Sequence, residues 1–282
     1  MKSSLSALLL FFLFSTASSA AELSQFRDLD NDPNPGRARL GAALEKGLEA
    51  YESVRDYKAM FQKQERSGNI LGPKESIFLK FEKPFKIFMG WTNTTKKGLQ
   101  VLYERGKHQG KLAVHKPGLL LGLAPLIFLD QNSPWVREGS ESYNIEDAGI
   151  GSFLNDFSQA VLKAAKDNRL EVTVPEGPNV GETMDVTFAR SKENDGFFAY
   201  RVVVHFNEET ALPDRMELFD WQNQPMGVYA YENLQLNVGN DDPEFKQFAM
   251  RKIYQLYLPA IQSATSSNNF NGKNPRATPT DG

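Results

Sequence analysis

A two-residue alternation of apolar and polar side chains is the feature of this sequence that most restricts its fold. In YKAMFQKQERSG, the apolar residues Tyr57, Ala59 and Phe61 alternate with polar ones, and ESIFLKFEKPF repeats the pattern from Ile77. Successive side chains of a strand point to opposite faces, so each segment predicts a strand with one buried face. Similar short segments, separated by Gly, Pro or Asn, continue to Asn237 and predict roughly ten antiparallel strands.

Two longer segments have the spacing of amphipathic helices instead. In RARLGAALEKGLEAYESVRDY, residues 37–57, apolar side chains recur every three or four positions, and GIGSFLNDFSQAVLKAAKDNRL, residues 149–170, repeats this spacing. A third, shorter helix is expected at PEFKQFAMRKIYQLY, residues 243–257. An antiparallel sheet with one apolar face has to bury that face against such helices. The pattern therefore predicts a mainly β, α+β fold, in which an incomplete antiparallel β-barrel wraps around amphipathic helices.

The N-terminus has the parts of a secretory signal peptide. Lys2 is followed by an apolar run from Leu8 to Phe14, and small residues lead to an expected cleavage site after Ala20 or Ala21. The run is too short to span a bilayer, which takes about 20 residues. We therefore expect an exported, soluble, periplasmic protein without a transmembrane anchor after cleavage. The expected organisation is a signal peptide at residues 1–20, a polar lead-in at 21–36, one domain at 37–258 and a disordered tail at 259–282.

The composition restricts the possible partners and chemistry. The chain contains no cysteine, which excludes disulfides, thiolate metal sites and a lipid anchor on cysteine. Its net charge is −3 and its Lys and Arg residues are scattered, so a nucleic-acid partner is not expected. The sequence contains neither a phosphate-binding glycine loop nor a G-x-S-x-G turn. These observations favour a protein that is not an enzyme and needs no cofactor.

Two candidate sites for ions or catalysis were tested against the spacing that each requires. Asp28, Asp30 and Asp32 alternate as in a calcium loop, but Pro33 and Arg39 occupy the places that require Gly and Glu. The sequence therefore predicts no metal site there. The three histidines, His108, His115 and His205, are not paired on a helix. A hydrolase whose site assembles in space around His205 or His115 stays a possible alternative.

The apolar faces of the strands are the candidate ligand site. If the sheet curls without closing, its concave face and the helices enclose an apolar cavity. The alternative is a core without a cavity, which is the default for alternating strands. The candidate cavity-lining residues are Phe61, Ile77, Leu79, Phe81, Phe88, Val101, Tyr103, Val186, Phe188, Val202 and Val204.

Several blocks of the sequence carry a family resemblance. These are YESVRDYKAMFQKQER, ESIFLKFEKPFKIFMGW, GLQVLYERGKHQGKLAVH, IEDAGIGSFL and YAYENLQLNVGNDDPEF, in this order. Over about residues 48–246 the chain resembles an exported bacterial family of unknown function, domain-of-unknown-function family fifteen-seventy-one. That family more remotely resembles periplasmic lipoprotein carriers and lipoprotein-sorting factors of the LolA/LolB kind. The resemblance implies an incomplete barrel around helices, with a hydrophobic cavity that receives acyl chains.

The most apolar stretch after the signal, GLLLGLAPLIFLD at residues 118–130, lies between a predicted strand and the second long helix. It is too short to span a membrane and contains Gly122 and Pro125. Its apolar residues point in nearly all directions on a helix, which favours a short helix or flap over the cavity, although burial as plain core is the alternative. The candidate lid residues are Leu119, Leu120, Leu123, Ile127 and Phe128.

Together these observations favour a periplasmic binding or carrier protein for a lipid or a lipoprotein acyl chain. One alternative is a structural or interaction module of the cell envelope, which would bind another envelope protein or a glycan through aromatic residues. The candidate residues for such binding are Trp91, Trp135, Tyr143 and Trp221. The hydrolase is the second alternative.

Overall fold

The computed structural model describes residues 26–27, 29, 31–116, 126–133, 145–175, 182–192 and 195–239. Some predictions lie outside the described residues. These are the signal peptide, the closing helix at 243–257, the tail, the lid residues Leu119, Leu120 and Leu123, and the aromatic residues Trp135 and Tyr143.

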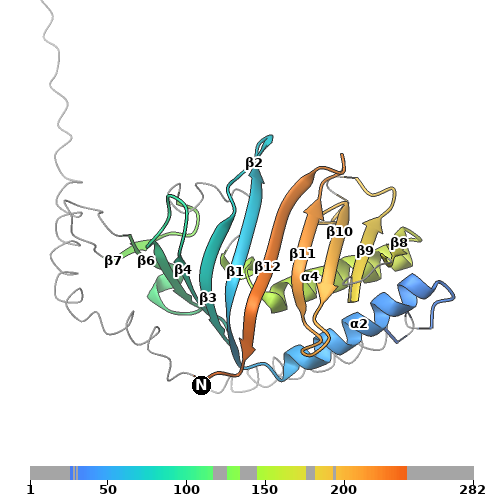
Figure 1. Ribbon diagram of the computed structural model, residues 1–282, viewed down its shortest axis with the longest axis horizontal. Helices are drawn as coiled ribbons and strands as arrows, with labels where there is room; N and C mark the ends of the chain where they lie inside the picture. Colours follow the sequence, from blue (N-terminus) through green and yellow to red (C-terminus); the bar gives the residue numbers. More distant parts are fainter. Residues whose placement is uncertain are drawn as a thin grey trace, which may run out of the picture.

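The described residues form one large, curled antiparallel sheet (Figure 1). Its strands are β1 (Asp56–Ser67), β2 (Ile70–Leu71), β3 (Glu75–Glu82), β4 (Lys86–Trp91), β5 (Gln100–Glu104), β6 (Leu112–His115), β7 (Leu126–Leu129), β8 (Leu170–Thr173), β9 (Glu182–Phe188), β10 (Arg201–Phe206), β11 (Pro213–Phe219) and β12 (Pro225–Leu236). The strand order is β7-β6-β5-β4-β3-β1-β12-β11-β10-β9-β8, and β2 pairs only with β1.

The first and last long strands join two meanders in the middle of this sheet. β1 pairs with β3 on one side and with β12 on the other, where Phe61 lies opposite Tyr231. Because β7 and β8 are the two edges of the path and do not pair with each other, the barrel is incomplete. The structure thus confirms the predicted fold class, an incomplete antiparallel β-barrel with amphipathic helices.

Both predicted long helices form, but the first ends at Glu52, and Asp56 and Tyr57 of its predicted segment belong to β1 instead. Helix α2 (Pro35–Glu52) begins two residues earlier than expected, because the Asn34 side chain accepts hydrogen bonds from the backbone N–H groups of Gly36 and Arg37. Helix α4 (Ile150–Lys166) buries one stripe, which includes Ile150, Leu154, Phe157, Val161 and Ala164. Two short 3₁₀ turns, η1 (His108–Gly110) and η2 (Ile145–Asp147), complete the described elements.

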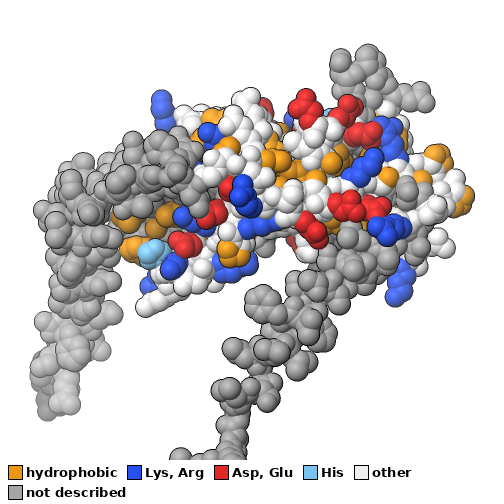
Figure 2. Space-filling view, turned by 90° about the horizontal axis from the view of Figure 1, so that it is seen from below, with side chains coloured by type: hydrophobic (Ala, Val, Ile, Leu, Met, Phe, Trp, Pro, Cys, Tyr) orange, Lys and Arg blue, Asp and Glu red, His pale blue; other side chains and the backbone are white. Residues whose placement is uncertain are grey.

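The helices cover only part of the concave face. Figure 1 shows α2 and α4 crossing the half of the sheet formed by β8–β12, and α4 contacts β8 and β11. Beneath them Val186, Phe188, Val202 and Val204 are completely buried. No described long helix covers the half formed by β3–β7. On the face seen in Figure 2, positive and negative side chains are intermixed, with apolar side chains visible between them.

The structure corrects the prediction of a short helix for the last part of the apolar stretch at 118–130. Leu126–Leu129 form β7, an edge strand paired with β6, so the predicted helix is wrong for these residues. Ile127 and Leu129 pack against the main core, whereas Leu126 and Phe128 pack against a second cluster around Phe88 on the opposite face. A strand that contacts apolar groups on both faces is apolar at every position, which is why it resembled an all-round apolar helix.

Candidate functional site

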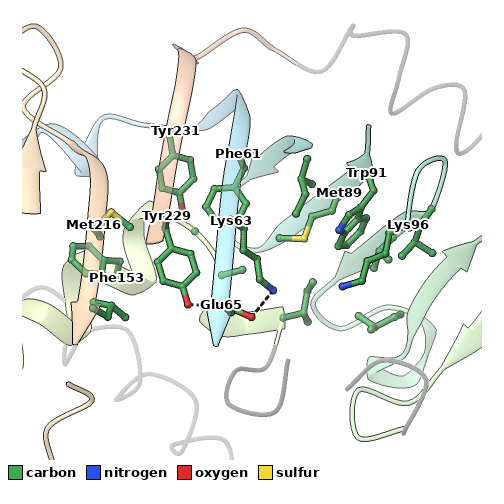
Figure 3. Close-up of a pocket in the computed structure, with 18 of the residues that line it drawn as sticks. Phe61, Lys63, Glu65, Met89, Trp91, Lys96, Phe153, Met216, Tyr229 and Tyr231 are labelled. Atoms are coloured by element: carbon green, nitrogen blue, oxygen red, sulfur yellow. Dashed lines mark hydrogen bonds and ion pairs between the residues drawn. The ribbon is translucent and has the colours of Figure 1, made fainter. Parts of the chain in front are cut away.

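A cavity of about 270 Å³ lies on the concave face, beside the N-terminal end of α4 (Figure 3). It extends from β11 and β12 across β1 to the strands β3–β7, over which no described long helix lies. Its wall consists mainly of apolar side chains from both meanders and from α4. The lining residues are Phe61, Lys63, Glu65, Ile77, Met89, Trp91, Lys96, Leu99, Val101, Leu112, Val114, Leu129, Ile145, Ala148, Gly149, Phe153, Asp156, Phe198, Met216, Leu218, Tyr229 and Tyr231.

The register of the strands arranges the floor of the cavity in rows. One row runs Tyr231–Phe61–Ile77–Trp91 across β12, β1, β3 and β4. A second apolar row runs from Leu79 in β3 through Met89, Val101 and Val114 in β4, β5 and β6. The floor is therefore a continuous apolar surface built from strands that are distant in sequence.

The next row along the same face is polar. Lys63 lies two residues beyond Phe61 on β1, between Tyr229 of β12 and Glu75 of β3. Since residues two apart on a strand share a face, Glu65 also points toward the cavity. One end of the cavity is thus charged, while its floor is apolar.

Two ion pairs organise this polar end. Lys63 Nζ lies 2.9 Å from Glu65 Oε2, and the Tyr229 hydroxyl donates a 2.9 Å hydrogen bond to Glu65 Oε1. The second pair joins Lys96 Nζ to Glu75 Oε1 at 2.6 Å.

The indole of Trp91 connects this second pair to the apolar floor. Its Nε1–H donates a 2.8 Å hydrogen bond to Glu75 Oε2, so Glu75 is held by both Trp91 and Lys96. The Lys96 ammonium group also lies 5.9 Å from the centre of the Trp91 ring. Each carboxylate is therefore bonded through both of its oxygen atoms.

The N-terminal end of α4 forms the opposite wall and is fixed by a buried tyrosine. The Ile150 backbone N–H donates a 3.1 Å hydrogen bond to the Tyr57 hydroxyl oxygen. The residue before it, Gly149, has φ 115°, and a Cβ atom there would lie 3.0 Å from that oxygen. Burial raises the pKa of Tyr57 well above its ordinary value, so the hydroxyl remains a neutral hydrogen-bonding group.

The sequence-predicted lining residues fall into three groups. Phe61, Ile77 and Val101 line the cavity. Leu79, Phe81 and Tyr103 are buried in the same core outside the cavity lining, as are the four residues beneath the helices, Val186, Phe188, Val202 and Val204. Phe88 is the correction, since it lies on the opposite face of the sheet with Ala113. Its neighbours Ile87 and Met89 are also apolar, so the sequence alternation could not show which face Phe88 occupies.

The polar end was missed by the sequence reasoning, although a signal for it exists. The alternation that places Phe61 on the inner face continues to Lys63 and Glu65, and that of β3 continues from Ile77 to Glu75. Tyr229 and Tyr231 are likewise two apart on β12. What the pattern could not supply is the pairing of β1 with β12, which brings these residues together.

The three histidines, which were the candidates for a catalytic or metal site, lie outside the cavity lining. His205 Nδ1 is 2.5 Å from Asp214 Oδ1, and the side chain of His205 alternates with the buried Val204 and Phe206, so it faces away from the cavity. The ring of His108 packs against Phe128, and His115 is buried in β6. Within the described ranges, no group of three His, Asp or Glu residues is arranged to hold a metal ion.

Of the aromatic residues proposed for an interaction module, Trp91 lines the cavity. Trp221 is only partly exposed, and its Nε1–H donates a 3.3 Å hydrogen bond to Ser191. None of the helices in the described part of the chain is both long enough and apolar enough to span a membrane.

Comparison with known proteins identifies one matching family and several solved structures of similar fold. The family described as "Protein of unknown function (DUF1571)" matches residues 54–275, which agrees with the resemblance found in the sequence. No curated protein matches the sequence.

Among solved structures, the chain is similar to the lipoprotein LppX of Mycobacterium tuberculosis, with 11% identity, TM-score 0.41, and coverage of 73% of this chain and 98% of that one. A LolA superfamily protein of Nitrosomonas europaea has 10% identity, TM-score 0.33, and coverage of 71% and 94%. MucB in complex with MucA, from Pseudomonas aeruginosa, has 13% identity, TM-score 0.39, and coverage of 72% and 59%.

Proposed function

The chain belongs to the DUF1571 family, and we propose that it is an exported binding or carrier protein for an apolar ligand, a lipid or the acyl chain of a lipoprotein. The observation that carries the proposal is the cavity on the concave face of the sheet. Side chains such as Met89, Val101, Val114 and Phe153 give it an apolar wall. An apolar surface of this kind on an open sheet is suited to a ligand that water solvates poorly.

Binding would proceed by burial alone, without a covalent step. Each methylene group that moves from water into the cavity contributes about 0.8 kcal/mol. The volume of about 270 Å³ is just below the range of about 300–1,000 Å³ that is usual for small-molecule sites. In this form the cavity therefore suits one slim acyl chain, and a multi-chain lipid anchor would require the cavity to widen.

The proposed location follows from the N-terminal signal peptide expected from the sequence. Export would place the protein in the periplasm, where a carrier can take up an acyl chain and deliver it to another envelope component. Ile127, which faces the main core from the edge strand β7, keeps its proposed role in a lid, whereas Phe128 is a correction because it packs against Phe88 on the opposite face.

The direct test is to identify what co-purifies with the mature protein. We expect mass spectrometry of an organic extract to show lipid in near-equal molar amount, and a fluorescent fatty acid to bind and to be displaced by unlabelled lipid. A clean extract, together with no binding of the fluorescent fatty acid, would refute the proposal.

A pair of variants locates the binding to the cavity. Val101 lines the cavity, and its neighbour Leu102 lies on the other face of β5. Val101→Phe adds volume inside the cavity and should weaken binding of the fluorescent fatty acid about tenfold or more, whereas Leu102→Phe should leave binding unchanged. Equal effects of the two substitutions would place the binding elsewhere.

A further inference from the structure

The polar end of the cavity indicates which kind of apolar ligand fits, and this inference rests on the proposed function. Charged groups are not expected in a site for a purely hydrocarbon ligand, because burying them costs free energy and such a ligand offers them no partner. Here Lys63 and Glu65 line the cavity although only 16% and 15% of their side-chain surfaces are exposed. Figure 3 shows the side chains of Lys63 and Lys96 reaching the same end of the cavity, one from β1 and one from the β4–β5 connection.

The two lysines at this end keep N–H donors that no described residue uses. An ammonium group carries three N–H donors, and Lys63 and Lys96 each use one on a carboxylate. In contrast, both oxygen atoms of Glu65 and both of Glu75 already accept a hydrogen bond or ion pair. An anionic acceptor can take these N–H donors without displacing a carboxylate, whereas a cation has to compete with Lys63 and Lys96 for oxygen atoms that already accept, and this favours an acceptor with negative charge.

The ion pairs also explain why two lysines are stable beside an apolar surface before a ligand binds. A partly buried charge without a partner is strongly unfavourable, and the paired glutamates remove that penalty. Together Lys63, Lys96, Glu65 and Glu75 carry no net charge. An anionic group can then join the pairs and bridge the ammonium groups without uncovering an isolated charge. Among the described residues that line the cavity, Asp156 is the one other charged residue besides Lys63, Glu65 and Lys96; it is exposed on α4 and accepts a hydrogen bond from Asn155.

We propose that the ligand is a single-chain amphiphile with an anionic head group, a carboxylate or a phosphate, bound between Lys63 and Lys96 with its chain on the apolar floor. The row that begins at Tyr229 holds the head group, and the Tyr231–Phe61–Ile77–Trp91 row contacts the first part of the chain. The orientation is fixed because only one end of the floor is charged.

Four probes with the same alkyl chain test the head group on the mature wild-type protein. Dodecanoate and dodecyl phosphate are anionic, methyl dodecanoate is neutral, and dodecylamine is cationic. Each displaces a neutral fluorescent lipid probe, and the measured quantity is Kd. We expect one or both of the anionic probes to bind about tenfold tighter than the ester, the size of one charge-assisted hydrogen bond, and the amine to bind most weakly. Tighter binding of the carboxylate indicates a fatty acid, and tighter binding of the phosphate indicates a phospholipid-like head group.

Charge-neutral double variants assign the preference to the lysines. K63M/E65Q and K96M/E75Q each remove one ion pair as a unit, so that no charge is left unpaired, and each should reduce the preference for the anion. Glu65→Gln alone removes a competitor for Lys63 and should tighten anion binding. Lys97, an exposed neighbour of Lys96 that does not line the cavity, gives the control Lys97→Met, which should keep the preference.

The possible failures are distinguishable. If no probe binds the wild-type protein, the proposed function itself is wrong. If all four probes bind equally and the double variants change nothing, the apolar ligand stands and the head-group proposal is overturned. Tighter binding of the amine, weaker anion binding by the Glu65→Gln variant, or an equal loss in the Lys97→Met control would also overturn it.

Discussion

Replacing Tyr57 with Phe tests whether one buried hydroxyl holds α4 against the sheet. The ring of Tyr57 stacks on Phe81 at 5.1 Å and meets Tyr231 edge-on at 6.3 Å, and a phenylalanine ring keeps both contacts. Only the hydroxyl is lost, and with it the acceptor for the Ile150 N–H. A buried donor left without a partner costs about 1–3 kcal/mol, a large part of the about 5–15 kcal/mol that stabilises a typical domain.

The measurement is equilibrium unfolding in guanidinium chloride, followed by the fluorescence of the three tryptophans. We expect the free energy of unfolding to fall by about 1–3 kcal/mol with an unchanged slope against denaturant concentration. Tyr231→Phe is the matched control, since that buried hydroxyl makes no hydrogen bond to any described residue, and its loss should change stability by less than about 0.5 kcal/mol. The reasoning is refuted if Tyr57→Phe is neutral, or if the two variants lose the same stability.

Three further predictions concern pH, a helix end and the lid. Burial raises the pKa of Tyr51 to about 12 from an ordinary value of 10.0, so its stabilising contribution is complete below pH 10. About 3 kcal/mol of that contribution should be lost between pH 10 and pH 12, and Tyr51→Phe should flatten the fall in an alkaline unfolding series. Asn34→Ala should lower the free energy of unfolding by about 1 kcal/mol, and Asn34→Gly by only about a few tenths. Ile127→Asp should weaken uptake of a fluorescent fatty acid about tenfold while circular dichroism stays unchanged, and complete unfolding instead would identify Ile127 as plain core.

The sequence predicts where the helices and strands lie better than it predicts which face of each strand points to the concave side. Alternation around Phe61 and Ile77 identifies both the strands and their inner sides, because the residues between them are polar. The same logic fails where a strand is apolar at consecutive positions, as at Ile87, Phe88 and Met89, since such a strand is buried on both faces. The local pattern then carries no information about orientation.

The site required a long-range pairing that no local pattern contains. Lys63 reaches its place beside Tyr229 only because β1 pairs with β12, the last described strand of the chain. Sequence reasoning supplied the alternation of each strand separately, and thus a set of inner faces without their order. The order determines which apolar residues line the cavity and which, such as Val186 and Val202, lie beneath a helix.

The uncovered half of the sheet follows from the lengths of the elements. Helix α4 has 17 residues, which corresponds to about 25 Å at 1.5 Å per residue. Neighbouring strands lie about 4.8 Å apart, so a helix of this length that crosses the strands spans about five of them. Figure 1 shows α4 crossing the part of the sheet that contains β8 and β11, which it contacts. The N-terminal end of α4 lies against Tyr57 of β1, and the strands from β4 to β7 extend beyond it, where Gly149 and Phe153 form a wall of the cavity. The two meanders join into a sheet that, measured across its strands, is about twice as wide as α4 is long. The cavity lies where α4 ends and the sheet continues. Among the described residues no second helix of similar length lies over β3–β7, which is what a packed core on that half of the sheet would require.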